Sequence, residues 1–401
     1  MTSFRPPRRE PATPVSEELL LPRFDRELRS HGFSGEGEQL LVAFSGGLDS
    51  LVLLHLLRFG RGLPNLQLHA AHFDHGMRPE SEKDAHWARG ICRAWDIPIV
   101  EGRADPVPTS ENEARERRYE FLFGARETTG TTWILTAHHA DDQAETVLFR
   151  ILRGTGLTGL GGIPRRRRPG ILRPLLSFPR RELEAYAAHQ GLRPREDPSN
   201  LDLKIPRNFL RHSALPALEA NVAPGARRAL VRLARMAREN EKAWGTLLPV
   251  LLDGVLEEDD RGAFIVRHRF LAYHPTVQVR LLREVLRSQG VTLTEVGTRA
   301  ALEFTRTCAS GRSLDLPGGL RLIREFDGFL LAPPDAPGEE SVVTVNGPAE
   351  GSGELVVGGR SFQVRWGCSE ASEMAEVVSL PPKDLAFPLR FRAWCPGDRI
   401  A

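Results

Sequence analysis

The first half of the chain alternates between short apolar runs and longer amphipathic stretches. Apolar runs that predict buried strands span residues 40–44, 66–73, 97–101 and 133–137. Amphipathic stretches that predict helices span residues 49–59, 80–95, 111–127 and 139–153. Because strands that alternate with helices of this length form βαβ units, the pattern predicts an α/β domain with a parallel sheet covered on both faces.

Beyond residue 153 this alternation stops. We expect a glycine-rich, basic loop, then a helix over residues 179–190 and helical spacing from about residue 215 to 290. Residues around 300–330 are expected to add a helix and a short strand pair. An acidic segment rich in proline and glycine follows and predicts a domain boundary. Strand-like alternation then predicts a small β-rich module, with strands at residues 341–345, 354–357 and 361–364.

Composition narrows the class of protein. Hydrophobic residues make up 41% of the 401 residues, without a run of about 18 uncharged apolar residues that would predict a membrane span. The N-terminal stretch carries arginines and prolines but no apolar segment, so it is not a secretory signal. The four cysteines, at positions 92, 308, 368 and 395, form no CxxC pair, which argues against a disulfide framework or a zinc ribbon. These features favour a cytoplasmic protein of two or three domains.

Positive charge is carried almost entirely by arginine. Lysine occurs only at positions 83, 204, 242 and 383. The formal net charge of the whole chain is just +2. Arginines cluster at positions 165–168 and recur at positions 207, 211, 227, 228, 232 and 235. The planar guanidinium suits phosphate recognition, whereas a general bias toward arginine codons explains the composition equally well.

The strongest chemical motif joins the first predicted strand to the first predicted helix and consists of Ser45, Gly46, Gly47, Leu48, Asp49 and Ser50. Glycines there allow a sharp turn whose N–H groups point at an anion, and the helix N-terminus adds a favourable dipole. Serine hydroxyls can donate to phosphate oxygens, and Asp49 can hold a magnesium ion that bridges them. The motif is neither a Walker A loop nor a GxGxxG fingerprint. An ordinary tight turn is the alternative, but the whole motif in this position favours nucleotide binding.

Three polar residues, His72, Asp74 and His75, end the second predicted strand. Ligands of open α/β sheets bind at the carboxyl ends of the strands, so these residues are expected near the nucleotide. A metal site is the alternative, but no third ligand is evident. We therefore expect nucleotide-binding or loop-ordering roles for them.

Two further charged pairs share a helix face because their members lie three positions apart. Asp142 and Glu145 could cradle an ammonium group, or they could simply stabilise a helix N-terminus. Arg115 and Arg118 could face phosphates, or they could belong to a solvated helix face. The run Arg165–Arg168 suits a phosphodiester backbone, with a solvated loop as the alternative.

Several motifs in one order resemble those of the tRNA(Ile)-lysidine synthetases, also called synthases, a branch of the PP-loop ATP pyrophosphatases. The matching segments are SGGLDS at residues 45–50, HFDHGMR at 72–78, NEARERRY at 112–119, TAHHADDQAET at 136–146, RGTGL at 153–157, EDPSN at 196–200 and RNFLR at 207–211. Met77 stands where this family usually has leucine. The resemblance runs from about residue 40 to residue 216.

The resemblance implies that the enzyme uses ATP and Mg²⁺ to ligate free L-lysine to C2 of the wobble cytidine of a CAU-anticodon tRNA(Ile). It implies that SGGLDS, His72, Asp74 and His75 bind the nucleotide and that Asp142 and Glu145 hold the lysine. Arg115, Arg118 and Asp49 are expected to take part in catalysis. A homodimer is left open. The alternatives are another PP-loop tRNA-modifying enzyme, such as a cytidine thiolase, a small-molecule amidotransferase, and a non-catalytic tRNA-binding protein.

We therefore expect four parts. Residues 1–35 form a partly disordered leader, residues 36–215 a PP-loop ATPase domain of the adenine-nucleotide alpha-hydrolase-like type, residues 216–332 a helical domain that binds tRNA or substrate, and residues 333–401 a β-rich module. The last eleven residues resemble the start of the final PGDRI element of the family, which usually continues further. The C-terminal module is thus expected to be incomplete.

Overall fold

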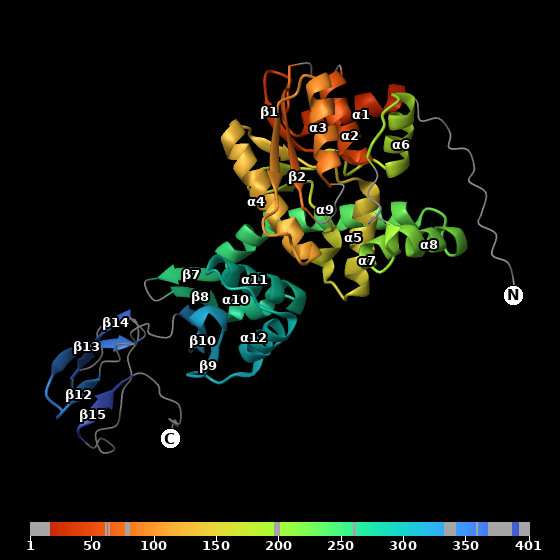
Figure 1. Cartoon of the computed structure of the whole chain (residues 1–401). Helices are drawn as coiled ribbons and strands as arrows, with labels where there is room; N and C mark the ends of the chain where they lie inside the picture. The colour runs from red at the N-terminus through yellow and green to blue at the C-terminus, as the bar shows by residue number, and fades with distance from the viewer. Residues whose placement is uncertain are drawn as a thin grey trace. The chain divides into compact units, whose positions relative to one another are not determined.

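The computed structural model describes residues 17–60, 62, 65–76, 81–195, 201–259, 262–332, 342–357, 360–367 and 387–392. The chain divides into two compact units, residues 1–241 and residues 242–401 (Figure 1). Among the described residues, no helix combines the length and the apolar character needed to span a membrane.

The first unit is built on a six-stranded sheet. Its strands are β1 (Gln39–Ala43), β2 (Gln67–Asp74), β3 (Ile99–Arg103), β4 (Trp133–Leu135), β5 (Arg166–Arg167) and β6 (Ile171–Leu172). Their order in the sheet is β3-β2-β1-β4-β6-β5, and every pairing is parallel except that of β5 with β6. The strand β1 therefore lies between β2 and β4, and the loops after these three strands open at the same edge.

Helices cover both faces of this sheet. The first unit contains α1 (Glu17–Ser30), α2 (Leu48–Phe59), α3 (Ser81–Ala94), α4 (Glu111–Thr129), α5 (Ala140–Leu152), the 3₁₀ helix η1 (Leu157–Gly161), α6 (Arg180–His189), α7 (Pro206–Phe209), the π-helix η3 (Leu210–Ala214), α8 (Leu215–Asn221) and the start of α9 (Ala226–Asp253). Figure 1 shows α1, α2, α3 and α6 on one side of the strands and α4 on the other.

The core follows from the two-residue period of the strands. In β1, Leu40 and Val42 point into a cluster shared with α1, α2 and α6, whereas Leu41 points into a second cluster shared with α4. Both faces of β1 are therefore buried, which is why its sequence is a continuous apolar run rather than an alternating one.

The predicted α/β alternation over residues 40–153 is confirmed within a few residues at each boundary. The two-residue strand β6 was not predicted, because two apolar residues after a basic loop carry no periodicity. Part of the range assigned to the leader is the helix α1, whose Leu20, Phe24 and Leu28 recur every four residues and pack into the core. Residues 1–16 lie outside the described residues.

The second unit contains a five-stranded antiparallel sheet in the order β7-β8-β11-β10-β9. Its elements are β7 (Leu256–Asp259), β8 (Gly262–Val266), α10 (Arg267–Ala272), α11 (Pro275–Ser288), α12 (Glu295–Thr307), β9 (Ser313–Asp315), the 3₁₀ helix η4 (Pro317–Gly319), β10 (Arg321–Arg324) and β11 (Gly328–Ala332). The expectation of helix throughout residues 215–290 is wrong at β7 and β8. The run Ala263–Val266 is buried at each position, and so short an apolar run does not distinguish strand from helix by period.

Beyond residue 341 the described residues form two strand pairs. β12 (Val343–Val345) pairs with β15 (Leu389–Phe391), and β13 (Gly351–Val357) pairs with β14 (Arg360–Trp366). The β-rich character expected for this region is confirmed. The C-terminal PGDRI segment, the EDPSN segment at residues 196–200, and residues 77 and 78 of the HFDHGMR motif lie outside the described residues.

Candidate nucleotide and lysine site

The SGGLDS motif forms the loop between β1 and α2. Gly46 has a φ of +85°, a conformation that favours glycine, and a Cβ there would lie in tight contact with the ring of Trp87, at 3.3 Å. Gly47 is the N-cap of α2 and provides no side-chain cap. The first-turn N–H groups of α2 are therefore available to an anion. The hydroxyls of Ser45 and Ser50 lie 3.1 Å apart beside them.

Asp49 lies in the first turn of α2 and contacts the neighbouring loop. Its Oδ2 atom is 3.5 Å from Nε2 of His139, which follows β4. Its Oδ1 atom is buried and has no hydrogen-bond partner in the part of the protein that the structure describes. A buried carboxylate oxygen without a partner is costly, so this atom is positioned for a ligand that the free protein lacks.

His139 is buried and begins α5 as part of a capping box. The backbone N–H of Asp142 donates to Nδ1 of His139 at 3.3 Å, and the Asp142 carboxylate accepts from the backbone N–H of His139 at 3.0 Å. Burial opposes charge on the imidazole, but the carboxylates of Asp142, Asp49 and Asp141 outweigh it and raise the pKa of His139. The adjacent His138 is half-buried, and there the desolvation of the imidazole dominates and lowers the pKa to about 3.

Asp142 and Glu145 lie on the buried face of α5, where two arginines hold them. Nε and Nη2 of Arg211 donate to both carboxylates at 2.6 to 3.0 Å. Nε of Arg207 donates to Glu145 at 3.0 Å, and its Nη2 donates to Asp142 at 3.2 Å. Burial opposes the charged forms, but the opposite charges outweigh it, so the pKa of Asp142 is lowered and that of Arg211 is raised. The four side chains form one neutralised cluster.

The polar residues at the end of β2 make contacts that connect and order the neighbouring loops. Nδ1 of His72 lies 2.9 Å from the backbone oxygen of Phe44, so it connects the ends of β1 and β2. Asp74 accepts from the N–H of Gly76 at 2.7 Å. Both His72 and Asp74 also line a cavity of about 270 Å³. Burial, followed by the positive charge of Arg118, lowers the pKa of His75.

Arg115 and Arg118 lie on α4 with their guanidinium carbons 5.3 and 5.4 Å from the ring centroid of Tyr119. Arg115 is exposed, whereas the guanidinium of Arg118 is largely buried, and burial lowers its pKa. Arg118 forms no ion pair with a described carboxylate, and its Nε has no hydrogen-bond partner there. Tyr119 favours the charged form of this guanidinium, whereas the positive charges of Arg115 and Arg207 oppose it. The site thus contains a buried cation that has no carboxylate partner among the described residues.

Comparison with known proteins identifies the family. A sequence model of the PP-loop domain matches residues 20–218. A tRNA(Ile)-lysidine synthase of Symbiobacterium thermophilum is 32% identical over 95% of this chain and 84% of its own length. A tRNA(Ile)-lysidine synthase of Geobacter sulfurreducens is 31% identical over 92% of this chain and 81% of its own length. This chain belongs to the tRNA(Ile)-lysidine synthase family.

Other relatives match more locally. A tRNA(Ile)-lysidine synthase of Thermotoga sp. strain RQ2 is 42% identical over 46% of this chain, and the match spans less than half of that relative, 46% of its length. A solved U34-tRNA thiolase of Methanococcus maripaludis is 20% identical with a TM-score of 0.46, over 55% of this chain and 80% of that one.

The donor set fits a magnesium ion, as expected for a lysidine synthase that uses ATP. No group of three or more His, Cys, Asp or Glu side chains that could hold a metal ion occurs among the described residues. Mg²⁺ needs no such group, because it is commonly held by one or two carboxylates together with substrate phosphates and water. Oδ1 of Asp49, which is buried without a hydrogen-bond partner among the described residues, would hold such an ion.

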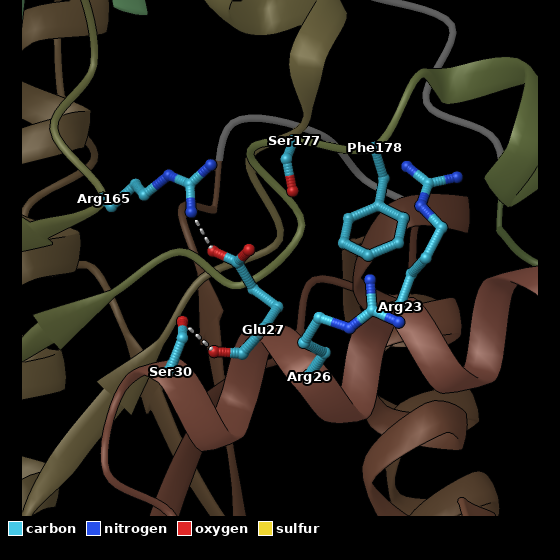
Figure 2. Close-up of a pocket in the computed structure, with 7 residues that line it drawn as sticks. All are labelled: Arg23, Arg26, Glu27, Ser30, Arg165, Ser177 and Phe178. Atoms are coloured by element: carbon cyan, nitrogen blue, oxygen red, sulfur yellow. Dashed lines mark hydrogen bonds and ion pairs between the residues drawn. The ribbon is translucent and has the colours of Figure 1, made fainter.

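A second cavity, of about 410 Å³, lies beside α1 (Figure 2). None of the candidate nucleotide or lysine ligands described above lines it. Two of its three arginines pair with carboxylates of the protein. Arg165 pairs with Glu27 at 2.5 Å, and Arg23 pairs with Glu182 at 2.7 Å while packing over the ring of Phe178. Ionic contacts at this cavity therefore attach α1 to the rest of the first unit.

The structure joins residues that the sequence presented separately. The loop at residues 45–50 meets the pair Asp142 and Glu145 through His139, and Arg118 lies within electrostatic range of Arg207. The roles of His139 and of the arginines at positions 207 and 211 were not predicted. The spacing of four between those two arginines was the available signal, because it places both on one helix face.

Proposed function

We propose that this chain ligates free L-lysine to C2 of the wobble cytidine of CAU-anticodon tRNA(Ile), in the cytoplasm, with ATP as the co-substrate. Lysidine, AMP and pyrophosphate would be the products. Family membership supports this proposal, and one observation carries it to residues: the anion-binding loop with Asp49 lies against the carboxylate pair Asp142 and Glu145 across a single imidazole. The proposed phosphate site and the proposed ammonium site would thus be adjacent.

The first step is activation of the base. The C2 carbonyl oxygen of the cytidine attacks the α-phosphorus of ATP, and pyrophosphate leaves toward the loop at residues 45–50. N–H groups of the first turn of α2 and the buried guanidinium of Arg118 would stabilise the developing negative charge. Arg115, exposed on the same helix, would contact the phosphates from solvent. Mg²⁺ held by Asp49 would neutralise phosphate oxygens.

The second step forms the carbon–nitrogen bond. The ε-ammonium group of lysine gives up a proton to solvent, and the free ε-amine attacks C2 of the adenylated cytidine. The new C–N bond forms with loss of a further N–H proton, and AMP leaves with the former carbonyl oxygen. Asp142 and Glu145 would hold the lysine through its ammonium group before that attack. Their burial removes competing water and strengthens the charge interaction. The cytidine must leave any stacked conformation to reach this site.

The tRNA body would be bound by residues 216–332, which include the basic start of α9, and by residues 333–401. Arg228, Arg232 and Arg235 are exposed on that helix, three or four positions apart, so they form a positive stripe. By contrast, Arg166 and Arg167 of the basic run pack over the rings of Trp133 and Tyr119. The α9 stripe is therefore the better candidate for contact with the phosphodiester backbone. The molar mass in solution, measured by light scattering, tests whether the enzyme is a homodimer.

The deciding experiment measures incorporation of radiolabelled lysine into tRNA with ATP and magnesium. We expect label in CAU-anticodon tRNA(Ile) and none in CAU-anticodon tRNA(Met), with loss of label on Asp49→Asn. ATP cleavage to AMP without labelled tRNA(Ile) would contradict lysidine formation and favour another PP-loop modification, such as cytidine thiolation. Mass spectrometry of the tRNA would then identify the group added.

A further inference from the structure

The two carboxylates that are proposed to bind lysine already have cationic partners in the free protein. Arg207 and Arg211 together make five hydrogen bonds to Asp142 and Glu145. Both carboxylates are buried, with side-chain exposures of 11% for Asp142 and 1% for Glu145. Such bonds between charged groups are roughly twice as strong as neutral ones. An incoming ammonium group therefore finds its binding site filled.

Charge balance shows why lysine cannot simply join this cluster. Two carboxylates and two guanidiniums sum to zero. A third fixed cation in a buried site would be repelled by the others and would gain no unpaired carboxylate. Binding of the lysine side chain thus requires one guanidinium to leave.

The two arginines are not held equally. Arg207 has a side-chain exposure of 36% and makes two bonds at 3.0 and 3.2 Å, whereas Arg211 has an exposure of 20% and makes three bonds as short as 2.6 Å. The backbone oxygen of Arg211 also accepts from Arg227. Arg211 lies in the π-helix η3, a rare geometry that often marks functional sites. Arg207 is therefore the arginine that can leave at the lower cost.

Movement of Arg207 need not involve the backbone. The adjacent Asn208 is buried, and its side-chain amide donates to the backbone oxygen of Asp202 at 3.0 Å. This contact fixes the start of α7, so the long arginine side chain can change rotamer toward solvent while its Cα stays in place. Arg211 meanwhile keeps contacts to both Asp142 and Glu145, so neither carboxylate is left without a partner.

We propose that Arg207 is a placeholder for the substrate: its guanidinium occupies the ammonium position on Asp142 and Glu145 in the free enzyme, and lysine binds by displacing it. This inference rests on the proposed function, and it makes Arg207 a positioning residue that sets the apparent affinity for lysine. The site is competent for lysine only in the fraction of molecules in which Arg207 has moved away. The apparent dissociation constant is raised by the reciprocal of that fraction.

The test compares the lysine dependence of labelled-lysine transfer to tRNA(Ile), at saturating ATP and tRNA, in the wild type, Arg207→Gln and Arg207→Lys. Removal of the placeholder is expected to lower the KM for lysine roughly three- to tenfold. Lysine at position 207 keeps the charge but lacks the two-pronged geometry, so that variant should fall between the other two. If Arg207→Gln does not fold, the KM of Arg207→Lys for lysine alone decides whether Arg207 is a placeholder.

A matched control is Arg23→Gln. Arg23 is exposed to a similar degree, 40%, and pairs with a carboxylate, Glu182, that is exposed by only 11%, at the cavity of Figure 2. This variant should leave the KM for lysine unchanged. An unchanged or higher KM for lysine in Arg207→Gln would overturn the proposal. If that variant is insoluble, the same result in Arg207→Lys would overturn it. A fall in kcat/KM for lysine together with the fall in KM would also overturn it.

Failure of the proposed function is a distinct result. In that case the wild type itself transfers no lysine to tRNA(Ile), and no KM exists to compare. If the wild type transfers lysine and only the expected fall in KM is missing, the proposed function stands and Arg207 is a structural partner of Asp142 and Glu145. Damage to folding lowers kcat or raises KM, so it does not imitate the expected result.

Discussion

Nε2 of His139 lies 3.5 Å from Oδ2 of Asp49. The contact joins the first turn of α2, which follows β1, to the N-cap of α5, which follows β4, and these two strands pair directly in the sheet. On its other side, His139 forms the capping box with Asp142. One buried imidazole thus positions the proposed magnesium ligand and the proposed lysine ligand relative to each other. Such supporting contacts often matter nearly as much as the ligands that they orient.

Replacing this imidazole should affect catalysis more than folding. We expect His139→Ala to lower the rate of lysine transfer about 10- to 100-fold, since Asp49 loses its orienting partner. Loss of the capping side chain should cost about 1 kcal/mol of unfolding free energy. The control is His55→Ala, which removes a histidine that hydrogen-bonds Tyr186 at 2.9 Å on the outer side of α2. Kinetics and denaturant unfolding of both variants should show that only His139→Ala loses activity disproportionately.

The same histidine should make stability depend on pH. Carboxylates hold the pKa of His139 above its ordinary value of 6.5, although burial opposes this. Its charge interactions therefore stabilise the fold fully below about pH 6.5, and this contribution is lost as pH rises through the higher native pKa. We expect the melting temperature of the wild type to exceed that of His139→Gln most at pH 6 and least at pH 9. A difference that grows with pH would contradict this.

Substitution of Gly46 tests the loop without removing any side chain that is proposed to contact ATP or Mg²⁺. Gly46→Ala introduces a Cβ at φ +85°, 3.3 Å from Trp87, which costs about 1–2 kcal/mol in backbone strain. We expect a higher KM for ATP, because the loop must shift where it would contact phosphate. Gly191→Ala is the matched control, since Gly191 has φ +65° with open space around it at the end of α6. It should lose stability without a change in that KM.

Neutralising the α9 stripe should weaken tRNA binding through its ionic part. We expect the combined change of Arg228, Arg232 and Arg235 to glutamine to reduce the dependence of log affinity on log salt concentration by about 2 to 3, because each lost phosphate contact removes roughly 0.7 to 0.9. The control replaces the exposed arginines at positions 58, 93 and 181, on α2, α3 and α6. Filter binding over a range of salt concentrations measures both. Equal losses in the two triple variants would indicate a diffuse field rather than a defined surface.

Prediction from sequence succeeded where one short segment sufficed. A loop between a buried strand and a helix must lie at the carboxyl edge of a parallel sheet, so the placement of Ser45 to Ser50 followed from local pattern. The partners of Asp142 and Glu145 did not follow, because Arg207 and Arg211 lie more than 60 residues further along the chain. Only the packing of α7 and η3 against α5 brings them together, and periodicity contains no information about such packing.

Arg118 carries a consequence for engineering of this enzyme. Its guanidinium is buried without a described carboxylate, so it lowers the stability of the free protein. Laboratory evolution that selects only for resistance to heat would therefore favour its replacement by an apolar residue. The resulting variants would be more robust and poorer at binding ATP phosphates, a trade-off between stability and activity that is located at one side chain. If Arg118 contacts the ATP phosphates as proposed, selection in the presence of ATP would remove this bias, because the bound anion would supply the opposite charge.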